Sequence, residues 1–325
     1  MTMTSPLATN PNAQAFCPKD RAEWLALRTN DVTASDIGCL FGIGRASKYQ
    51  LWIEKAKKEV MVLADNKRMF WGRKLELAIA QGICEEMGWE LIDQPVTYYR
   101  DASVGMGATP DFFVRCPKRG FGLLQIKNVD YIVFKQQWTP AKDSGEAPDY
   151  IEAQLQCELG VTGLGWGAIG ALVAGNDHHI YIREAYPDVI KAMQTECQRF
   201  WKSVTDGIEP PMDYTSDSEF IIKLNSKSSE GKVLDMSADL TLAELLTRYQ
   251  DASAREKNAG EEKDAIKAQI FVMVGDAEKV IAGDTKLNVG TTKDTEGTLI
   301  TQEMVGTRTG ARKGYRKLLI SQNKQ

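Results

Sequence analysis

Histidine is almost absent from this chain, which contains only His178 and His179 among its 325 residues. The two are adjacent in a strand-like stretch, so their side chains are expected on opposite faces, where they cannot easily share a metal ion. Zinc sites that depend on histidine and Ser-His-Asp triads are therefore poorly supported. We expect both histidines to be structural.

Closely spaced cysteines are also missing. The six cysteines are Cys17, Cys39, Cys84, Cys116, Cys157 and Cys197. The nearest two are 22 positions apart, so the chain has no CxxC pair of the kind that clips a metal. This spacing argues against an iron–sulfur cluster as well. We expect reduced, mostly buried thiols in a cytoplasmic protein.

No apolar run reaches the ~18 residues of a membrane span, so we expect no membrane partner. The first 18 residues carry no charge, and they lack the basic and apolar regions of a secretory signal peptide. We expect residues 1–20 to form a flexible N-terminal arm.

An excess of positive charge is missing too, because the net charge is −4. This balance does not indicate nucleic-acid binding, although a nuclease needs only a local basic channel. A hydrophobic content of 43% and a charged content of 26% are typical of a soluble globular protein. The length favours one large domain with an appendage.

Periodicity predicts an α/β or α+β core of about 190 residues, in which helices come first and a mixed sheet follows. The expected helices are 20–29, 35–41, 48–57, 71–87, 131–138, 150–161 and 187–205. The expected strands are 90–93, 96–100, 111–115, 122–127, 165–173 and 178–183. A proline-rich linker at 209–211 ends this core.

The remainder, residues 212–325, is predicted to be a C-terminal extension. Residues 240–274 form one long helix, or a helical pair divided at Gly260. Strands are expected at 279–281, 286–290 and 298–302. The last stretch, from Arg308 onward, is basic and can contact DNA or be a solvated tail.

The strongest site signal is a predicted hairpin between residues 111 and 127. Side chains alternate along a strand, so Gln125 and Lys127 share a face, and the hairpin brings them to Asp111. Two oxygen ligands beside a lysine form a minimal site for Mg²⁺ and the phosphate that it activates. The alternative is an ordinary hairpin with a surface acid and a surface lysine.

The sequence Pro110-Asp111, followed by Gln125-Ile126-Lys127, resembles the PD-(D/E)xK nuclease superfamily, with glutamine in place of the second acid. Three other stretches resemble motifs of the YqaJ-like viral recombinases, the lambda-exonuclease family. They are Gly72-x-x-x-Glu76, Tyr150-Ile-Glu-Ala-Gln154-Leu-Gln156, and Leu27-Arg28 followed by Ser35-Asp36. Each also has a structural interpretation, as a surface carboxylate, polar helix residues or a helix N-cap.

This resemblance covers residues 21–205 and implies a restriction-endonuclease-like fold, a mixed central sheet flanked by helices, in a domain at 21–211. It implies a Mg²⁺-dependent 5′→3′ exonuclease, for which Mn²⁺ substitutes. The enzyme digests one strand of linear double-stranded DNA and leaves 3′ overhangs for a single-strand annealing protein. Relatives form trimers, and a phage or prophage origin places the activity in the bacterial cytoplasm.

The resemblance also implies roles for individual residues. Ligands of the metal are the side chains of Glu76, Asp111 and Gln125 and the carbonyl of Ile126. Lys127 activates the attacking water, and Gln154 positions Lys127 or a phosphate. DNA and its 5′ phosphate are bound by Arg28, Ser35 and Gln156.

Gln125 departs from the superfamily pattern because glutamine is neutral. Metal affinity is weaker in consequence, or Glu76 compensates. Two other functions stay open: a structure-specific endonuclease on the same fold, and a catalytically inactive DNA-binding recombination factor.

Overall fold

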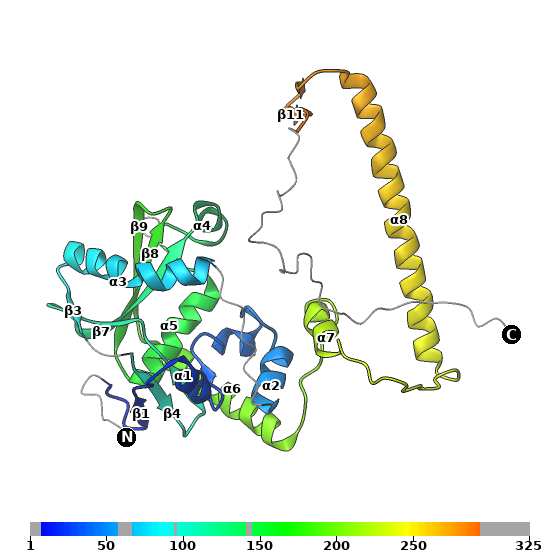
Figure 1. The fold of residues 1–325 in the computed structure, drawn as a ribbon. Coiled ribbons are helices and arrows are strands. Elements are labelled where there is room, and N and C mark those ends of the chain that lie inside the picture. The colour runs from blue at the N-terminus through cyan, green and yellow to red at the C-terminus, as the bar shows by residue number, and fades with distance from the viewer. Residues whose placement is uncertain (1–7, 58–66, 94–95, 141–144, 293–325) are drawn as a thin grey trace, which may run out of the picture. The chain divides into compact units, whose positions relative to one another are not determined.

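The computed structural model describes residues 8–57, 67–93, 96–140 and 145–292. The chain divides into two compact units, Met1–Leu224 and Asn225–Gln325. The first carries the sheets and most of the helices (Figure 1). The boundary expected at residue 211 therefore falls 13 residues before the division that the structure shows.

A five-stranded mixed sheet forms the centre of the first unit, in the order β3-β6-β7-β8-β9. Its strands are β3 (Glu90–Ile92), β6 (Phe112–Cys116), β7 (Gly120–Val129), β8 (Trp166–Val173) and β9 (Asp177–Glu184). Strands β7 and β8 are parallel, whereas the other neighbours are antiparallel. The predicted hairpin is β6–β7, and its turn contains Gly120 at φ +72°.

Helices cover both faces of this sheet. Helix α3 (Lys67–Met87) buries Ile79 and Ile83 in a cluster that includes Ile126. Helix α5 (Asp149–Thr162) buries Leu155 and Leu159 in the main core, on the other side of β7. Alternation along β7 explains this division, because successive side chains point to opposite faces. The expected mixed sheet flanked by helices is confirmed.

A smaller sheet, in the order β1-β4-β5-β2, holds the N-terminal part of the chain. Its strands are β1 (Ala13–Phe16), β2 (Val32–Thr33), β4 (Tyr98–Asp101) and β5 (Met106–Ala108). The structure differs here from the expected flexible arm, because β1 pairs with β4 and Ala15 is buried. The backbone amides of Thr9 and Asn10 also donate to the Thr162 carbonyl, at 2.8 and 3.1 Å.

The other helices of this unit are α1 (Arg21–Arg28), the 3₁₀ helix η1 (Ile37–Phe41), α2 (Lys48–Lys57), α4 (Tyr131–Gln137), α6 (Pro187–Asp206) and α7 (Ser218–Leu224). Helix α7 extends the unit beyond the expected linker. It docks through buried Phe220, which meets the ring of Tyr49 edge-on. Asp217 is also buried, and it accepts a hydrogen bond from Gln50 at 3.2 Å.

The second unit contains α8 (Leu240–Val274) and the hairpin of β10 (Lys279–Ala282) and β11 (Thr285–Asn288). Helix α8 runs without a break through Gly260, so the helical pair is the wrong alternative. The strand expected at 298–302 and the basic tail lie outside the described residues. In the part of the chain that the structure describes, no helix has both the length and the apolarity of a membrane span.

Candidate active site

The β6–β7 hairpin places Asp111 beside the backbone of β7. The last pair of the two strands is Phe112 with Leu124, and Asp111 stands just beyond it. Its Oδ2 accepts a hydrogen bond from the amide of Ile126 at 2.8 Å. Because the N–H and C=O of one strand residue point to the same side, the Ile126 carbonyl opens toward the same edge as Asp111.

Lys127 is the positive charge of this edge. It is partly buried, and its charge acts on three carboxylates, those of Glu76, Asp111 and Glu158. Burial raises the pKa of Asp111, while the ammonium of Lys127 and the Ile126 amide oppose the rise. The predicted grouping of Asp111 with Lys127 is therefore present in the structure.

Glu76 reaches this group from α3. Burial and then the negative charge of Asp111 raise the pKa of Glu76 to about 7, although Lys127 and Arg73 lower it. A carboxyl that resists ionisation in this way lies where a cation would be favoured. The structure thus brings Glu76 to Asp111 across 35 positions of sequence.

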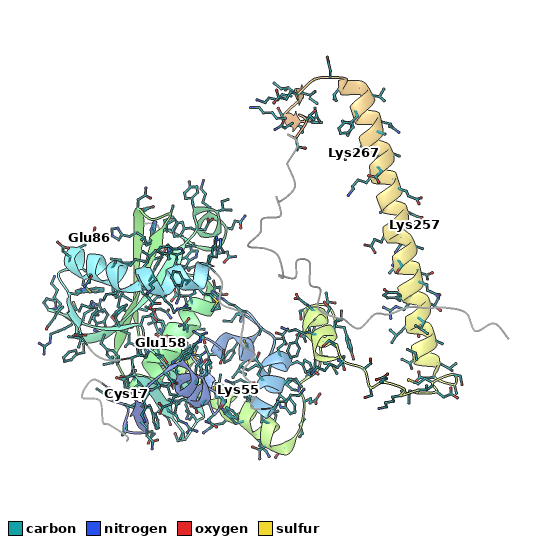
Figure 2. All side chains as sticks on the ribbon, viewed as in Figure 1. Cys17, Lys55, Glu86, Glu158, Lys257 and Lys267 are labelled. Carbon is teal, nitrogen blue, oxygen red and sulfur yellow. The ribbon has the colours of Figure 1, made fainter. Side chains whose placement is uncertain are left out.

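Glu158 was not predicted from the sequence, yet it belongs to the same group. It lies on α5 within the first unit (Figure 2), and 1% of its surface is exposed. Burial and then the charge of Asp111 raise the pKa of Glu158 to about 8. Its one sequence signal is the spacing of four from Gln154, which puts both on one helix face.

Gln125 is fully buried against α5 and bonded to Glu158. Its Nε2 donates to Glu158 Oε1 at 3.2 Å, and Gln154 Nε2 donates to the same oxygen at 3.0 Å. Within the described residues, four buried side-chain atoms lack a hydrogen-bond partner, and two of these are Gln125 Oε1 and Glu158 Oε2. Unpaired buried oxygens are costly, which suits a site that binds a cation.

Gln156 is the one predicted site residue that the structure places elsewhere. Its Nε2 donates to the Glu184 carbonyl, and its Oε1 accepts from the Tyr186 amide, both at 2.9 Å. Residues two apart on a helix point about 200° away from each other, so Gln156 cannot share the direction of Gln154. The expected contact of Gln156 with DNA is therefore corrected: Gln156 holds the β9–α6 connection.

A cleft of about 1100 Å³ opens over this group. Its lining includes Arg28, Glu76, Asp111 and Gln154, and Trp24 stands beside Arg28. Gln125, Lys127 and Ser35 do not line the cleft. The cleft thus joins Arg28, predicted to bind the 5′ phosphate, with three of the residues predicted for catalysis.

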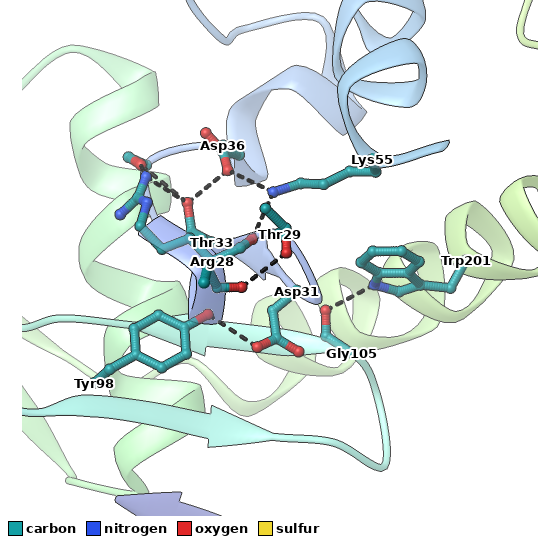
Figure 3. A network of polar contacts seen from close by, with 11 residues as sticks. Arg28, Thr29, Asp31, Thr33, Asp36, Lys55, Tyr98, Gly105 and Trp201 are labelled. Atoms are coloured by element: carbon teal, nitrogen blue, oxygen red, sulfur yellow. Dashed lines mark hydrogen bonds and ion pairs between the residues drawn. The ribbon is translucent and has the colours of Figure 1, made fainter. Parts of the chain in front are cut away.

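Arg28 ends α1 and anchors a polar network at the mouth of the cleft (Figure 3). Its Nη2 donates to Thr33 Oγ1 at 3.1 Å and to Ser35 Oγ at 2.9 Å. Its guanidinium lies 4.4 Å from the ring centroid of Trp24. Lys55 supports the same loop, donating to the Arg28 carbonyl at 2.9 Å. The network fixes the guanidinium in one orientation.

The donors of the site suit a hard cation. Carboxylate, amide and backbone carbonyl oxygens are the ligands that Mg²⁺ takes. Among the described residues, no three histidine, cysteine, aspartate or glutamate side chains converge closely enough to hold a metal ion. The set that fits is therefore mixed: Asp111, Glu76, the unpaired Oε1 of Gln125 and the Ile126 carbonyl.

Comparison with known proteins finds one matching family. The family described as the YqaJ-like viral recombinase domain matches residues 23–165. This span contains Arg28, Ser35, Glu76 and the whole β6–β7 hairpin, and it ends after α5. None of the curated proteins matches the sequence.

Three solved structures are similar to parts of the chain. An alkaline exonuclease of Laribacter hongkongensis, LHK-Exo, is 20% identical, and the match covers 62% of this chain and 99% of that one with a TM-score of 0.48. LHK-Exo in complex with dAMP is 19% identical, with 63% and 97% covered and a TM-score of 0.47. A phage-related exonuclease from Haemophilus somnus 129PT is 12% identical, with 57% and 100% covered and a TM-score of 0.40.

Proposed function

We propose that this chain is a metal-dependent exonuclease that digests one strand of linear double-stranded DNA from its 5′ end. The match of residues 23–165 to the YqaJ-like viral recombinase domain supports the proposal. The observation that carries the proposal is the meeting of Arg28 with Glu76 and Asp111 in one cleft. Phosphodiester hydrolysis at a DNA end requires both a group that holds the end and a group that cuts.

The metal would be Mg²⁺, for which Mn²⁺ can substitute. Its ligands would be the side chains of Asp111, Glu76 and Gln125 and the carbonyl of Ile126. When bound, the metal neutralises charge on the phosphate and lowers the pKa of a water molecule. The neutral Gln125 reduces the negative charge of the donor set.

Lys127 orients the attacking water and assists its deprotonation. The charge of Lys127 acts on the carboxylates of Glu76, Asp111 and Glu158, so the side chain lies close to the proposed metal ligands. Gln154 lines the cleft, while its Nε2 donates to Glu158. Gln154 thus positions a phosphate above Lys127 without taking part in proton transfer.

Arg28 and Ser35 hold the terminal 5′ phosphate. A terminal phosphate carries more negative charge than an internal diester, so a fixed guanidinium gains most from it. The bonds from Arg28 to Thr33 and Ser35 and its contact with the Trp24 ring pre-set the orientation of the guanidinium.

The product of this reaction is a duplex with a 3′ single-stranded overhang. Such an overhang is the substrate of a single-strand annealing protein, and we propose such a protein as the partner. We further propose a phage or prophage origin and action in the bacterial cytoplasm. We also propose that the active form is a homo-oligomer, such as a trimer.

A single experiment tests the proposal. The full chain is incubated with Mg²⁺ and linear duplexes labelled at either 5′ end, beside nicked and closed circular DNA of the same sequence. Loss of the 5′ label as mononucleotide, with the closed circle intact, supports the exonuclease. Cutting of the closed circle would show a structure-specific endonuclease, and DNA binding without turnover would show an inactive recombination factor.

A further inference from the structure

The site has a neutral glutamine at position 125, and an acid from another element lies beside it. Gln125 is neutral, and Glu158 of α5 lies against it, at 3.2 Å between Nε2 and Oε1. Both side chains are almost completely buried, at 0% and 1% exposure. Once Glu158 is ionised, Gln125 and Glu158 form a pair with one negative charge, the charge that a single acid at 125 would carry.

The hydrogen bonds of this pair determine which atom faces the metal. An amide nitrogen donates and a carboxylate accepts, so the Glu158 bond fixes the amide of Gln125 with its nitrogen toward α5. The oxygen of that amide is then turned away from α5. It has no hydrogen-bond partner within the described residues, although it is buried.

Among the described residues, Glu158 forms no ion pair within 4.0 Å, although the more distant charge of Lys127 acts on it. Its Oε1 accepts from the amides of Gln125 and Gln154, which are both uncharged, and its Oε2 is unpaired. A buried carboxylate without a positive partner is strongly disfavoured unless a cation lies nearby. Glu152 on the same helix shows the contrast, because it forms an ion pair with Arg183 at 2.7 Å.

We infer that Glu158 is a positioning residue of the metal site: it holds the Gln125 amide so that Oε1 binds the metal, and it supplies the negative charge that Gln125 lacks. The ion is a divalent cation that prefers oxygen ligands. This inference rests on the proposed function for the presence of the metal. It means that α5, through Glu158, supplies negative charge to the metal site that β7 alone does not provide.

The test exchanges the two side chains. Binding of Mn²⁺ is measured by isothermal titration calorimetry on the full chain for wild type, Glu158→Gln, and the double variant Gln125→Glu/Glu158→Gln. Loss of a group that supports a metal ligand costs about 10- to 100-fold in metal affinity. Glu158→Gln should weaken Mn²⁺ binding by that factor, and the exchange should restore it to within about threefold, because charge and hydrogen bond are both recovered.

Glu152→Gln provides the matched control, with the same substitution on the same helix. It removes an ion pair that does not face the metal site, so it should lower the melting temperature and leave Mn²⁺ affinity unchanged. Circular dichroism of each variant without metal confirms that the fold is retained.

Three outcomes would overturn the inference: a wild type that binds no Mn²⁺, a Glu158→Gln variant that binds as tightly as wild type, or an exchange variant no tighter than Glu158→Gln. If the Mn²⁺ affinities follow the expected order but the chain digests no DNA, the role of Glu158 is supported and the exonuclease is rejected. The two proposals therefore fail separately.

Discussion

The guanidinium of Arg28 donates to the hydroxyl of Ser35 at 2.9 Å, which ties the end of α1 to the loop before η1. Both side chains would otherwise sample several rotamers at the protein surface. Joined to each other, they form a preset corner at the mouth of the cleft that also contains Glu76 and Asp111.

This corner should make the enzyme sensitive to the chemistry of the DNA end. Linear duplex with a 5′ phosphate should be digested at least tenfold faster than the same duplex with a 5′ hydroxyl, because the fixed guanidinium gains most from the more charged group. Arg28→Ala should reduce this ratio toward one. Arg21→Ala is the matched control, since Arg21 lines the same cleft from the same helix. Equal wild-type rates on the two duplexes would reject the corner as a phosphate site.

Asp111 should be necessary for chemistry and dispensable for folding. Asp111→Asn keeps an oxygen that can accept from the Ile126 amide but removes the charge, so the melting temperature should change little. The digestion rate should fall by about 10²- to 10⁴-fold, the scale of a group that acts in the chemical step. Lys127→Ala should show a similar loss. A variant of either residue that keeps near wild-type turnover at saturating Mg²⁺ would contradict the assignment.

Without divalent cations, the protein should lose stability as the pH rises. The folded-state pKa values of Glu76 and Glu158, about 7 and about 8, lie above the ordinary value of 4.5. A raised pKa means that the folded state binds the proton more tightly, so this contribution is complete below about pH 4.5 and is lost as the pH passes through 7 to 8. The melting temperature in EDTA should fall between about pH 4.5 and about pH 8, and Glu158→Gln should make this fall smaller. A flat wild-type profile would contradict the shifts.

Gln156 should contribute to stability and not to DNA binding. Gln156→Ala leaves the Tyr186 amide and the Glu184 carbonyl without their partner, and each lost hydrogen bond costs about 0.5–1.5 kcal/mol. Urea unfolding should show this loss, while the affinity of the folded protein for a DNA end stays within about twofold of wild type. A large loss of DNA affinity with unchanged stability would return Gln156 to the binding site.

The parts of the fold with strong local patterns could be predicted from the sequence. Helix α3 has apolar residues at helical spacing, and the β6–β7 hairpin has alternating strands around a turn rich in glycine and lysine. Strand β1 could not be predicted, because its four residues are stabilised by pairing with β4, more than 80 positions away. Continuity of α8 through Gly260 was ambiguous, since one glycine costs only about 1 kcal/mol in a helix.

The candidate site divides along similar lines. Asp111 and Lys127 were predicted because motif letters and the hairpin pattern both indicated them, whereas Glu76 was predicted from motif letters alone. Glu158 was missed because it lies within a buried, largely apolar stretch of α5, where an acid carries no surface pattern. Gln156 was assigned to DNA from motif letters alone, and helix rotation, which points it toward β9, was not taken into account.

The two helices that cover opposite faces of the sheet each contribute an acid beside Lys127, and these acids are far apart in the chain. Glu76 precedes the central strands, whereas Glu158 follows three of them. Contacts of such long sequence separation form late, after the loops between them have closed. A chain that is still emerging from the ribosome, or one cleaved between α3 and α5, therefore has no assembled site. The proposed activity would therefore appear only after α5 has packed against the sheet.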